Sequence, residues 1–209
     1  MARPRGTRSE DYEAKRAALI AKLRDRLRAP GPRPSLRELS VAAEVSQPTL
    51  RHYFGDREGL VRAVMADELE GGTAPLREAA TPSGPLSASV RDLLRHAGSG
   101  LAEYGLTDAH AVGLAEGLAS EASASDYLSL ALEPTLDAFA ERLAGHDMVG
   151  ELRENVDTRA AALALLAPLV LAHLHQRRLG GADSHPLDLD ALADQLADGF
   201  VRGYGKNQD

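Results

Sequence analysis

Cysteine and tryptophan are absent from this 209-residue chain, and aromatic residues are few. The lack of cysteine excludes disulfides, thiolate metal centres and cysteine nucleophiles. Alanine and leucine are abundant instead, which favours helices over strands. No segment alternates polar and apolar residues over the length of a strand. The composition therefore predicts an all-α protein, with enough residues for one or two small domains.

Long apolar runs are also missing. Arg3, Arg5 and Arg8 lie near the N-terminus, but no apolar region follows them, as a secretory signal would require. The longest uncharged apolar stretch, residues 160–172, is short for a membrane span and contains Pro168. We expect a cytoplasmic protein with no membrane partner.

The sequence has none of the familiar signatures of catalysis. It contains no Gly-rich phosphate loop, no dinucleotide fingerprint and no Gly-x-Ser-x-Gly elbow. His173 and His175 are close in sequence, but on a helix their side chains would diverge by about 200°. The other histidines have no metal-ligand spacing. We expect no metal, no cofactor and no enzyme. A helical-bundle enzyme stays a minor alternative, because distant residues can meet in a fold.

Charge is divided unevenly along the chain. The net charge is −7, which by itself argues against binding to nucleic acid. Residues 1–62, however, carry 14 Lys and Arg against 8 Asp and Glu, whereas the rest carries 10 against 23. A basic N-terminal part on an acidic body is expected when one end of a protein meets DNA. Ordinary surface variation would give the same numbers, so charge alone does not decide.

Residues 35–60 have the spacing of two short helices joined by a tight turn, followed by the start of a third. Ser35 and Glu38 form a predicted capping box at the first helix. Ser46 is a suitable N-cap for the second helix. Pro48 falls in its first turn, where no backbone donor is lost.

The second of these helices is predicted to expose polar side chains. Leu50 and Phe54 are four residues apart and face inward. The side chains left pointing outward are those of Gln47, Thr49, Arg51, His52 and Tyr53. Two short helices, the second with outward hydrogen-bond donors, form the helix-turn-helix arrangement that fits a major groove.

This stretch resembles the DNA-binding domain of the TetR family of bacterial transcriptional regulators. The residues that match the family pattern are Ser35, Leu39, Ala43, Val45, Ser46, Leu50, Phe54, Arg57 and Leu60. Glu44 stands where the family usually has Gly, so the turn is less relaxed if that position needs a positive φ. Arg51 replaces the usual Tyr, and Tyr53 replaces the usual His. The resemblance is sharp over residues 10–70 and only architectural beyond them.

The outward residues become candidate DNA contacts. Gln47 and Arg51 would reach base edges, since Gln suits adenine and Arg suits guanine. Phosphate contacts are expected from Thr49, His52, Tyr53 and Arg57. Ser35 would offer its hydroxyl and nearby backbone N–H groups to a phosphate. The other interpretation is a solvated helix face with Tyr53 packed on its neighbours.

We predict four consecutive parts of the chain. They are a disordered basic tail (1–8), a three-helix helix-turn-helix DNA-binding domain (9–55), a connecting helix (56–70) and a helical effector-binding and dimerisation domain (71–209). The first helix is expected from Ser9 to Arg28, and a Gly- and Pro-rich connector from Gly71 to Pro85. Helices of the second domain are expected at about 86–104, 107–120, 123–145 (with a candidate kink at Pro134), 156–179 and 188–204.

The last two expected helices are strongly apolar. Residues 156–179 are apolar nearly all round, and 188–204 carry a stripe at helical spacing. From the residues alone, a dimer interface and the monomer's own core are equally good explanations. The family resemblance favours a homodimer. The interface residues would then be Leu166, Val170, Leu174, Leu189, Leu192, Leu196 and Phe200.

The resemblance also implies a small-molecule effector inside the second domain. Candidate residues interrupt apolar helical faces: Tyr104, His110, Glu116, Tyr127, Phe139 and His173. For each of them, a core aromatic or a surface polar group is the more ordinary explanation.

The sequence therefore predicts a sequence-specific DNA-binding transcriptional regulator. The resemblance implies a ligand-responsive repressor that acts as a homodimer on a palindromic operator in double-stranded DNA. The alternative is a helical protein-interaction module that has lost DNA binding.

Overall fold

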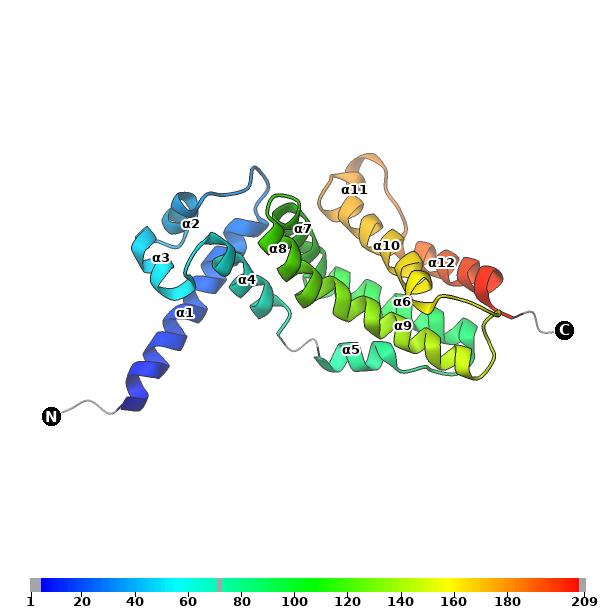
Figure 1. The fold of residues 1–209 in the computed structure, drawn as a ribbon. Coiled ribbons are helices and arrows are strands. Elements are labelled where there is room, and N and C mark those ends of the chain that lie inside the picture. Colours follow the sequence, from blue (N-terminus) through cyan, green and yellow to red (C-terminus); the bar gives the residue numbers. More distant parts are fainter. Residues whose placement is uncertain (1–4, 71–72, 207–209) are drawn as a thin grey trace. The chain divides into compact units, whose positions relative to one another are not determined.

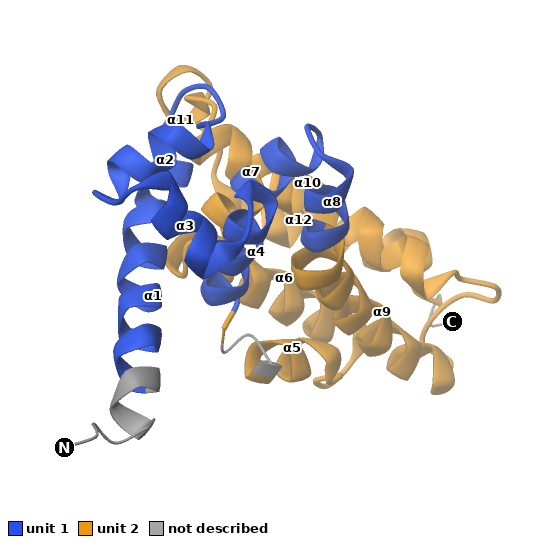
Figure 2. Ribbon diagram, turned by 60° about the vertical axis from the view of Figure 1, so that its left-hand side comes forward, with its two compact units in different colours: residues 1–69, 112–127 blue, residues 70–111, 128–209 orange. Residues whose placement is uncertain are grey.

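The computed structural model describes residues 5–70 and 73–206, and all the regular structure in these ranges is helical (Figure 1). The predicted all-α class is confirmed. The described chain forms two compact units (Figure 2). Unit 1 contains residues 5–69 and 112–127, and unit 2 contains residues 70–111 and 128–206. The predicted division at residue 71 did not include the return of 112–127 to the first unit.

Unit 1 is built from four N-terminal helices and the end of a later helical hairpin. The first four are α1 (Arg5–Arg28), α2 (Leu36–Ala42), α3 (Gln47–Phe54) and α4 (Arg57–Glu68). The hairpin consists of the second half of α7 (Leu106–Gly117) and α8 (Glu121–Tyr127). α1 begins at Arg5, four residues before the predicted Ser9. Residues 1–4 of the predicted tail lie outside the described residues.

One leucine from each N-terminal helix is fully buried in the core of unit 1: Leu23, Leu39, Leu50 and Leu60. These leucines come from helices that are mostly short, so tertiary burial supplies most of their stability. The face of α3 that was predicted to point inward, with Leu50, is therefore the buried one.

Two glycines let α7 and α8 pack closely within unit 1. A Cβ atom at Gly113 would lie 2.2 Å from Cδ2 of Tyr127, and one at Gly117 would lie 3.2 Å from Cα of Ala124. Their spacing of four residues places both glycines on one face of α7. That face therefore needs residues without side chains.

Unit 2 is a bundle of long helices joined by several shorter helical segments. Its helices are α5 (Thr73–Ala80), α6 (Leu86–Glu103), the first half of α7, α9 (Glu133–Met148), α10 (Thr158–Arg177), α11 (Gly181–Ser184) and α12 (Leu189–Tyr204). A π-helical turn, η1 (Leu128–Leu132), precedes Pro134. The predicted kink at Pro134 thus corresponds to a change of helical form. The core of the bundle includes Leu93, Phe139 and Leu169.

Helix α5 occupies part of the stretch that was predicted as a connector, and this prediction was wrong. Ala79 is buried in the core of unit 2. The guanidinium of Arg142, on α9, donates to the carbonyl oxygens of Ala79 at 2.6 Å and Glu78 at 2.8 Å. It also donates to the Ser89 carbonyl at 2.9 Å. Because this cap comes from a residue far along the chain, the local Gly and Pro signals could not reveal the helix.

Among the described helices, α10 is the one long and apolar enough to cross a membrane by composition. Leu165 and Leu169 are buried in the core of unit 2, and Pro168 lies inside the helix. The core helix of a bundle meets the same criteria, so α10 is not evidence for a membrane protein.

Candidate nucleic-acid interface and effector cavity

The start of α2 has the predicted capping box. The Glu38 N–H donates to Oγ of Ser35 at 3.3 Å, and the Ser35 N–H donates to Oε2 of Glu38 at 2.8 Å. The hydrogen bonds that the carboxylate accepts from the Ser35 N–H and hydroxyl lower the pKa of Glu38. The Ser35 hydroxyl also donates to the same carboxylate at 2.8 Å. A DNA phosphate at this position would therefore compete with Glu38 for the hydroxyl.

The turn between α2 and α3 contains a left-handed residue. Glu44 has a φ of +59°. The position that differs from the family's glycine thus has the positive φ that glycine adopts without strain, and a non-glycine residue there costs about 1–2 kcal/mol. The side chain of Glu44 pairs with Lys22 of α1, and this contact lowers its pKa. The pair ties the strained turn to the neighbouring helix.

Helix α3 has a fixed N-terminus and one buried face. Oγ of Ser46 accepts a hydrogen bond from the Thr49 N–H at 3.2 Å and lies 2.8 Å from the Thr49 hydroxyl. Leu50 and Phe54 are buried, as predicted. This anchoring holds the opposite face of α3 in one orientation.

The opposite face of α3 differs from residue to residue. Arg51 and His52 are exposed, whereas Gln47 and Thr49 are half-buried. The Tyr53 ring stacks on Tyr12 of α1, with the ring centroids 4.7 Å apart. The stacking is the alternative that the sequence left open for Tyr53. The exposed His52 ring lies edge-on to Tyr12 and Tyr53, with ring centroids 6.0 and 5.2 Å apart, so Arg51 is the freest of the candidate DNA contacts.

Arg57, a predicted phosphate contact, is bound to a carboxylate within unit 1. Its Nη1 and Nη2 atoms donate to Oε2 and Oε1 of Glu116, each at 2.6 Å. Its Nε donates to the Pro34 carbonyl at 2.9 Å. Nε of Arg33 donates to the same Glu116 carboxylate at 2.5 Å. We call Arg33, Arg57 and Glu116 the arginine–glutamate triad.

The triad satisfies a buried carboxylate. The side chain of Glu116 is 4% exposed. Burial alone would raise its pKa, but the hydrogen bonds from Arg57 and Arg33 hold the pKa below its ordinary value. Glu116 was a candidate effector contact, and the structure instead places it against the loop that precedes α2 and the start of α4. No sequence signal pointed to this pairing, because its partners are 59 and 83 residues away.

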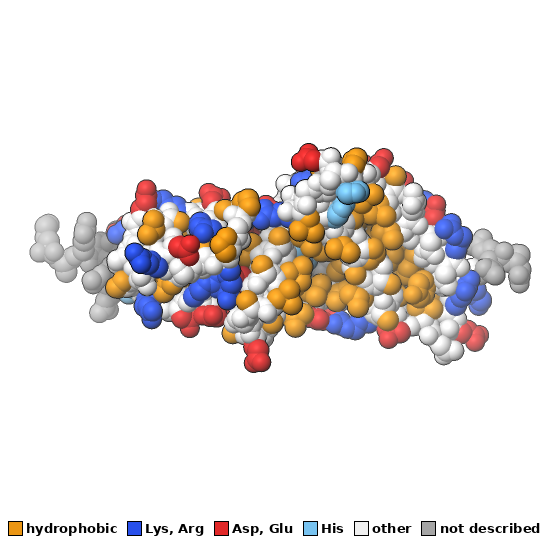
Figure 3. Space-filling model, turned by 90° about the horizontal axis from the view of Figure 1, so that it is seen from above, with side chains coloured by type: hydrophobic (Ala, Val, Ile, Leu, Met, Phe, Trp, Pro, Cys, Tyr) orange, Lys and Arg blue, Asp and Glu red, His pale blue; other side chains and the backbone are white. Residues whose placement is uncertain are grey.

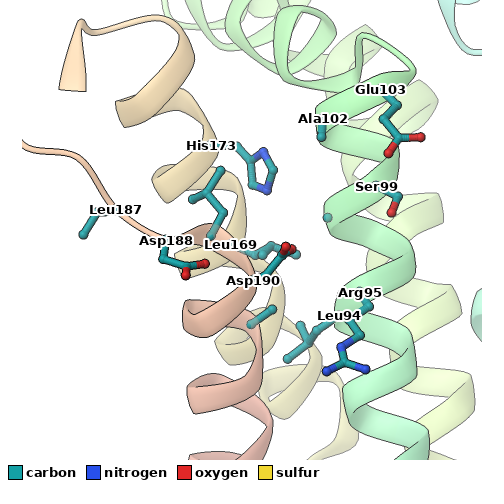
Figure 4. A pocket seen from close by; sticks show the side chains of 13 residues that line it. Leu94, Arg95, Ser99, Ala102, Glu103, Leu169, His173, Leu187, Asp188 and Asp190 are labelled. Carbon is teal, nitrogen blue, oxygen red and sulfur yellow. The ribbon is translucent and has the colours of Figure 1, made fainter. Parts of the chain in front are cut away.

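Unit 2 contains a cavity of about 360 Å³ between α6, α10 and the start of α12 (Figure 4). Its walls include the apolar residues Leu94, Leu169, Leu187 and Leu189, and the polar residues Arg95, Ser99, Glu103, His173, Asp188 and Asp190. His173 is the effector candidate that lines it. Its side chain is 3% exposed, and its Nδ1 atom has no hydrogen-bond partner.

The other effector candidates do not line this cavity. Tyr104 is 75% exposed, and Phe139 is a core residue of unit 2. His110 is buried, which lowers its pKa to about 4. Tyr127 lies in unit 1 against Gly113, and burial raises its pKa to about 12. One effector candidate predicted from the sequence, His173, therefore lines the cavity. The charged residues in the cavity walls were not predicted.

The predicted dimer residues are distributed between the core and the edges of unit 2. Leu166, Val170 and Phe200 are buried in its own core. The half-buried ones are Leu174, Leu189, Leu192 and Leu196. Two of these, Leu174 and Leu196, also pack against that core, so five of the seven contact the core of a single chain.

The exposed apolar face of α10 is formed by other residues. These are Ala160, Leu163, Ala164, Ala167 and Leu171. Leu163 is 48% exposed and Leu171 is 63% exposed. Figure 3 shows hydrophobic side chains gathered over the surface of unit 2 where α10 and α12 lie. We call this set of five residues the outer face of α10.

Unit 1 contains a capped helix-turn-helix, and the regular structure in the described part of unit 2 is all helical. These features define the class of helical folds with an N-terminal helix-turn-helix. No protein-family model and no curated protein sequence matches the chain. Solved structures do. A TetR transcriptional regulator from Agrobacterium tumefaciens matches with a TM-score of 0.70 and 21% identity, over 93% of this chain and 96% of that one.

Two further matches are the regulators SmeT and FadR. SmeT, the repressor of the Stenotrophomonas maltophilia multidrug efflux pump SmeDEF, has a TM-score of 0.61 and 19% identity, over 94% of this chain and 91% of its own. FadR from Bacillus subtilis, solved with stearoyl-CoA, has a TM-score of 0.64 and 14% identity, over 92% of this chain and 98% of its own. The chain has the fold of TetR-family transcriptional regulators.

Proposed function

We propose that this protein is a sequence-specific DNA-binding transcriptional regulator. The proposal is carried by α3, whose buried Leu50 and Phe54 and capped N-terminus fix an outward face that includes an exposed arginine. A short helix held in this way can enter a major groove with its side chains already oriented. The fold, shared with SmeT and with other regulators, supports the same function.

Within that function, Arg51 and Gln47 are the proposed base-reading residues, with Thr49 and His52 on phosphates. Tyr53 is proposed to support α3 through its stacking on Tyr12 and to reach phosphate only secondarily. Ser35 and Arg57 would contact phosphate only by exchanging their present partners. The Thr49 hydroxyl, which lies 2.8 Å from Oγ of Ser46, and the His52 ring, which lies edge-on to two tyrosines, would likewise have to adjust, whereas Arg51 is exposed.

A homodimer is proposed for the DNA-bound form. The outer face of α10 presents two large aliphatic side chains, Leu163 and Leu171, among alanines. Contiguous exposed apolar surface of this kind is typical of protein interfaces. A two-fold dimer would place two α3 helices on the half-sites of a palindromic operator. The half-buried Leu192 and Leu196 of α12 are proposed to flank this interface.

The proposed function includes regulation of DNA binding by a small molecule. The cavity of unit 2, with the unpartnered nitrogen of His173 in its wall, supports it. A ligand would act by binding one state of the dimer more tightly than another, and it can shift the equilibrium only by that difference in affinity. We propose repression by occupation of the operator in the cytoplasm, and no catalytic role.

DNA binding tests the proposal directly. The full chain would be titrated with a duplex taken from upstream of its own gene, and with duplexes selected from random sequence, at several salt concentrations. We expect salt-dependent binding that random competitor DNA displaces poorly. Binding that random DNA displaces equally well, with no sequence enriched by selection, would contradict sequence-specific regulation.

A further inference from the structure

The cavity of unit 2 has more negative than positive charge in its walls. Glu103, Asp188 and Asp190 contribute carboxylates, and the guanidinium there is that of Arg95. Arg95 is already paired with Asp194, outside the cavity lining, at 3.0 Å. A ligand would therefore meet three exposed carboxylates that this arginine does not pair with, and Arg177 of α10 is a further cation near His173.

The three carboxylates differ in the hydrogen bonds and salt bridges that they already make. Asp188 is the N-cap of α12 and accepts a hydrogen bond from the Ala191 N–H at 2.9 Å. Glu103 and Asp190 make no side-chain hydrogen bond or salt bridge within the described ranges 5–70 and 73–206. Figure 4 shows Asp190 of α12 and His173 of α10 both projecting into the space that α6 borders. Asp190 is thus the carboxylate best placed to receive a cation.

His173 supplies an independent sign of a ligand. It is only 3% exposed, and its Nδ1 has no hydrogen-bond partner. Buried polar atoms are ordinarily paired, so a cavity-lining side chain with an unpaired ring nitrogen points to a missing partner there. Nδ1 itself has under 1 Å² exposed, so a ligand hydrogen-bonds to it only after the ring turns. Burial and the nearby charge of Arg177 lower the pKa of this imidazole, while Asp190 opposes them. The ring is therefore neutral near pH 7 and leaves the negative charge of the walls intact.

The remaining wall is apolar. Leu94 on α6, Leu169 on α10 and Leu189 on α12 border the same space. The volume of about 360 Å³ lies within the usual range for small-molecule sites. Apolar walls favour a hydrophobic ligand body, and the carboxylates disfavour an anionic headgroup.

We propose that this cavity binds an amphipathic amine: a small molecule with a hydrophobic body and a protonated nitrogen. The hydrophobic body packs against Leu94 and Leu169, and the ammonium group faces Asp190, with Glu103 adding to the negative potential. A polar group of the ligand meets His173. The effector role of this amine rests on the proposed regulatory function, whereas its binding does not.

Three probes that share one hydrophobic body separate the contribution of charge from that of shape. These are 4-phenylbutylamine, 4-phenylbutanol and 4-phenylbutyrate, which are cationic, neutral and anionic at pH 7. Each would be titrated into the full chain without DNA, by calorimetry and by the NMR signal of the His173 imidazole, assigned with His173→Gln. We expect the amine to bind at least tenfold more tightly than the alcohol, with the carboxylate weakest.

Matched charge variants assign the preference to the cavity. Asp190→Asn combined with Glu103→Gln should reduce the affinity of the amine about tenfold and leave that of the alcohol unchanged. The control, Asp147→Asn combined with Glu154→Gln, removes the same net charge from exposed positions outside the cavity lining and should retain the preference. Thermal unfolding checks that all variants are folded.

Several results would overturn the proposal. Equal affinities for the three probes, equal losses in the two double variants, or an unmoved His173 signal with each probe at millimolar concentration would do so. The operator titration tests the proposed regulatory function independently of ligand binding. Specific DNA binding without amine binding would reject the ligand class and keep the regulator, whereas amine binding without DNA binding would do the reverse.

Discussion

The two faces of helix α3 differ in polarity, whereas the two faces of helix α10 are both apolar and differ only in burial. In α3 the inward residues are apolar and the outward ones are polar, so the sequence already shows which side is buried. In α10 both sides are apolar: Leu166 is a core residue, and Leu163, three positions earlier, is 48% exposed. A polar outward face makes the buried side of a helix visible in the sequence. A helix with apolar residues on both sides gives no such contrast, and its buried side becomes visible only in the fold.

The largest expected effect is on the free energy of unfolding, and it distinguishes the buried side of α10 from the exposed side. Leu166→Ala removes a core side chain and should lower the free energy of unfolding by about 2–5 kcal/mol, because it leaves a cavity. Leu171→Ala, on the outer face, should change the unfolding of the monomer by less than about 0.5 kcal/mol. Denaturant titration at nanomolar protein concentration measures both values. Similar losses in the two variants would contradict the assignment of faces.

The same comparison extends to assembly. Leu163→Glu with Leu171→Glu should give a folded monomer at micromolar concentration, where we expect the unmodified chain to be a dimer, because two charges would be buried in the interface. Light scattering reads the mass directly. A dimer that survives both charges would place the interface elsewhere.

The arginine–glutamate triad is expected to give the next largest effect. Glu116→Gln leaves the guanidinium groups of Arg57 and Arg33 without a carboxylate and should cost about 3 kcal/mol of stability, at the low end for a buried pair because Arg33 is partly exposed. Since the folded-state pKa of Glu116 is lowered, its contribution is complete above the ordinary carboxyl pKa and is lost as the pH falls through the lowered value. The difference in unfolding free energy between the two proteins should therefore shrink in acid. A difference that stays constant down to about pH 2 would argue against the ion pairs.

DNA contacts give a smaller and more selective effect. Arg51→Ala should weaken operator binding by about 1–3 kcal/mol and relax the preference at one base pair, if Arg51 reads a guanine. Arg57→Ala should instead lower stability, with operator affinity per folded dimer changed less, because its guanidinium is engaged by Glu116. Titrations with operator variants, at a temperature where both proteins are folded, compare the two. The reverse order of effects would mean that DNA displaces Glu116 from Arg57.

The smallest expected effect concerns the turn before α3. Glu44→Gly relieves the left-handed strain but loses the pair with Lys22, whereas Glu44→Ala loses the pair and keeps the strain. The Gly variant should therefore be more stable than the Ala variant by about 1 kcal/mol. Thermal unfolding of the two variants measures this difference. Equal stabilities would show that the positive φ carries no cost here.

Local chemistry is what the sequence could predict. The capping box of Ser35 and Glu38, the N-cap Ser46 and the inward Leu50 are each specified by residues within a few positions of one another. Hence most of α2, α3 and the turn between them could be located from the order of the residues alone. Even the strain at Glu44 was foreseeable from the glycine that usually stands there.

Features made by distant residues could not be predicted in this way. Helix α5 depends on the burial of Ala79 and on the Arg142 cap from α9. Glu116 looked like a polar interruption in an apolar helix, for which a surface polar group was a more ordinary explanation than a ligand contact, and its ion pairs were not predicted. The spacing of Gly113 and Gly117 was a usable signal of close helix packing, but it does not say what the neighbouring glutamate meets.

The arginine–glutamate triad also constrains how this sequence can diverge. Removing any one member leaves the others with uncompensated charge or an unmet hydrogen-bonding need, whereas replacing the whole set by apolar residues of similar volume can be neutral. Among homologous sequences, positions 33, 57 and 116 should therefore change together or not at all. Single exchanges at these positions should be rare. A lineage that changes from the charged triad to an apolar set passes through less stable intermediates, so it needs stabilising residues elsewhere in unit 1.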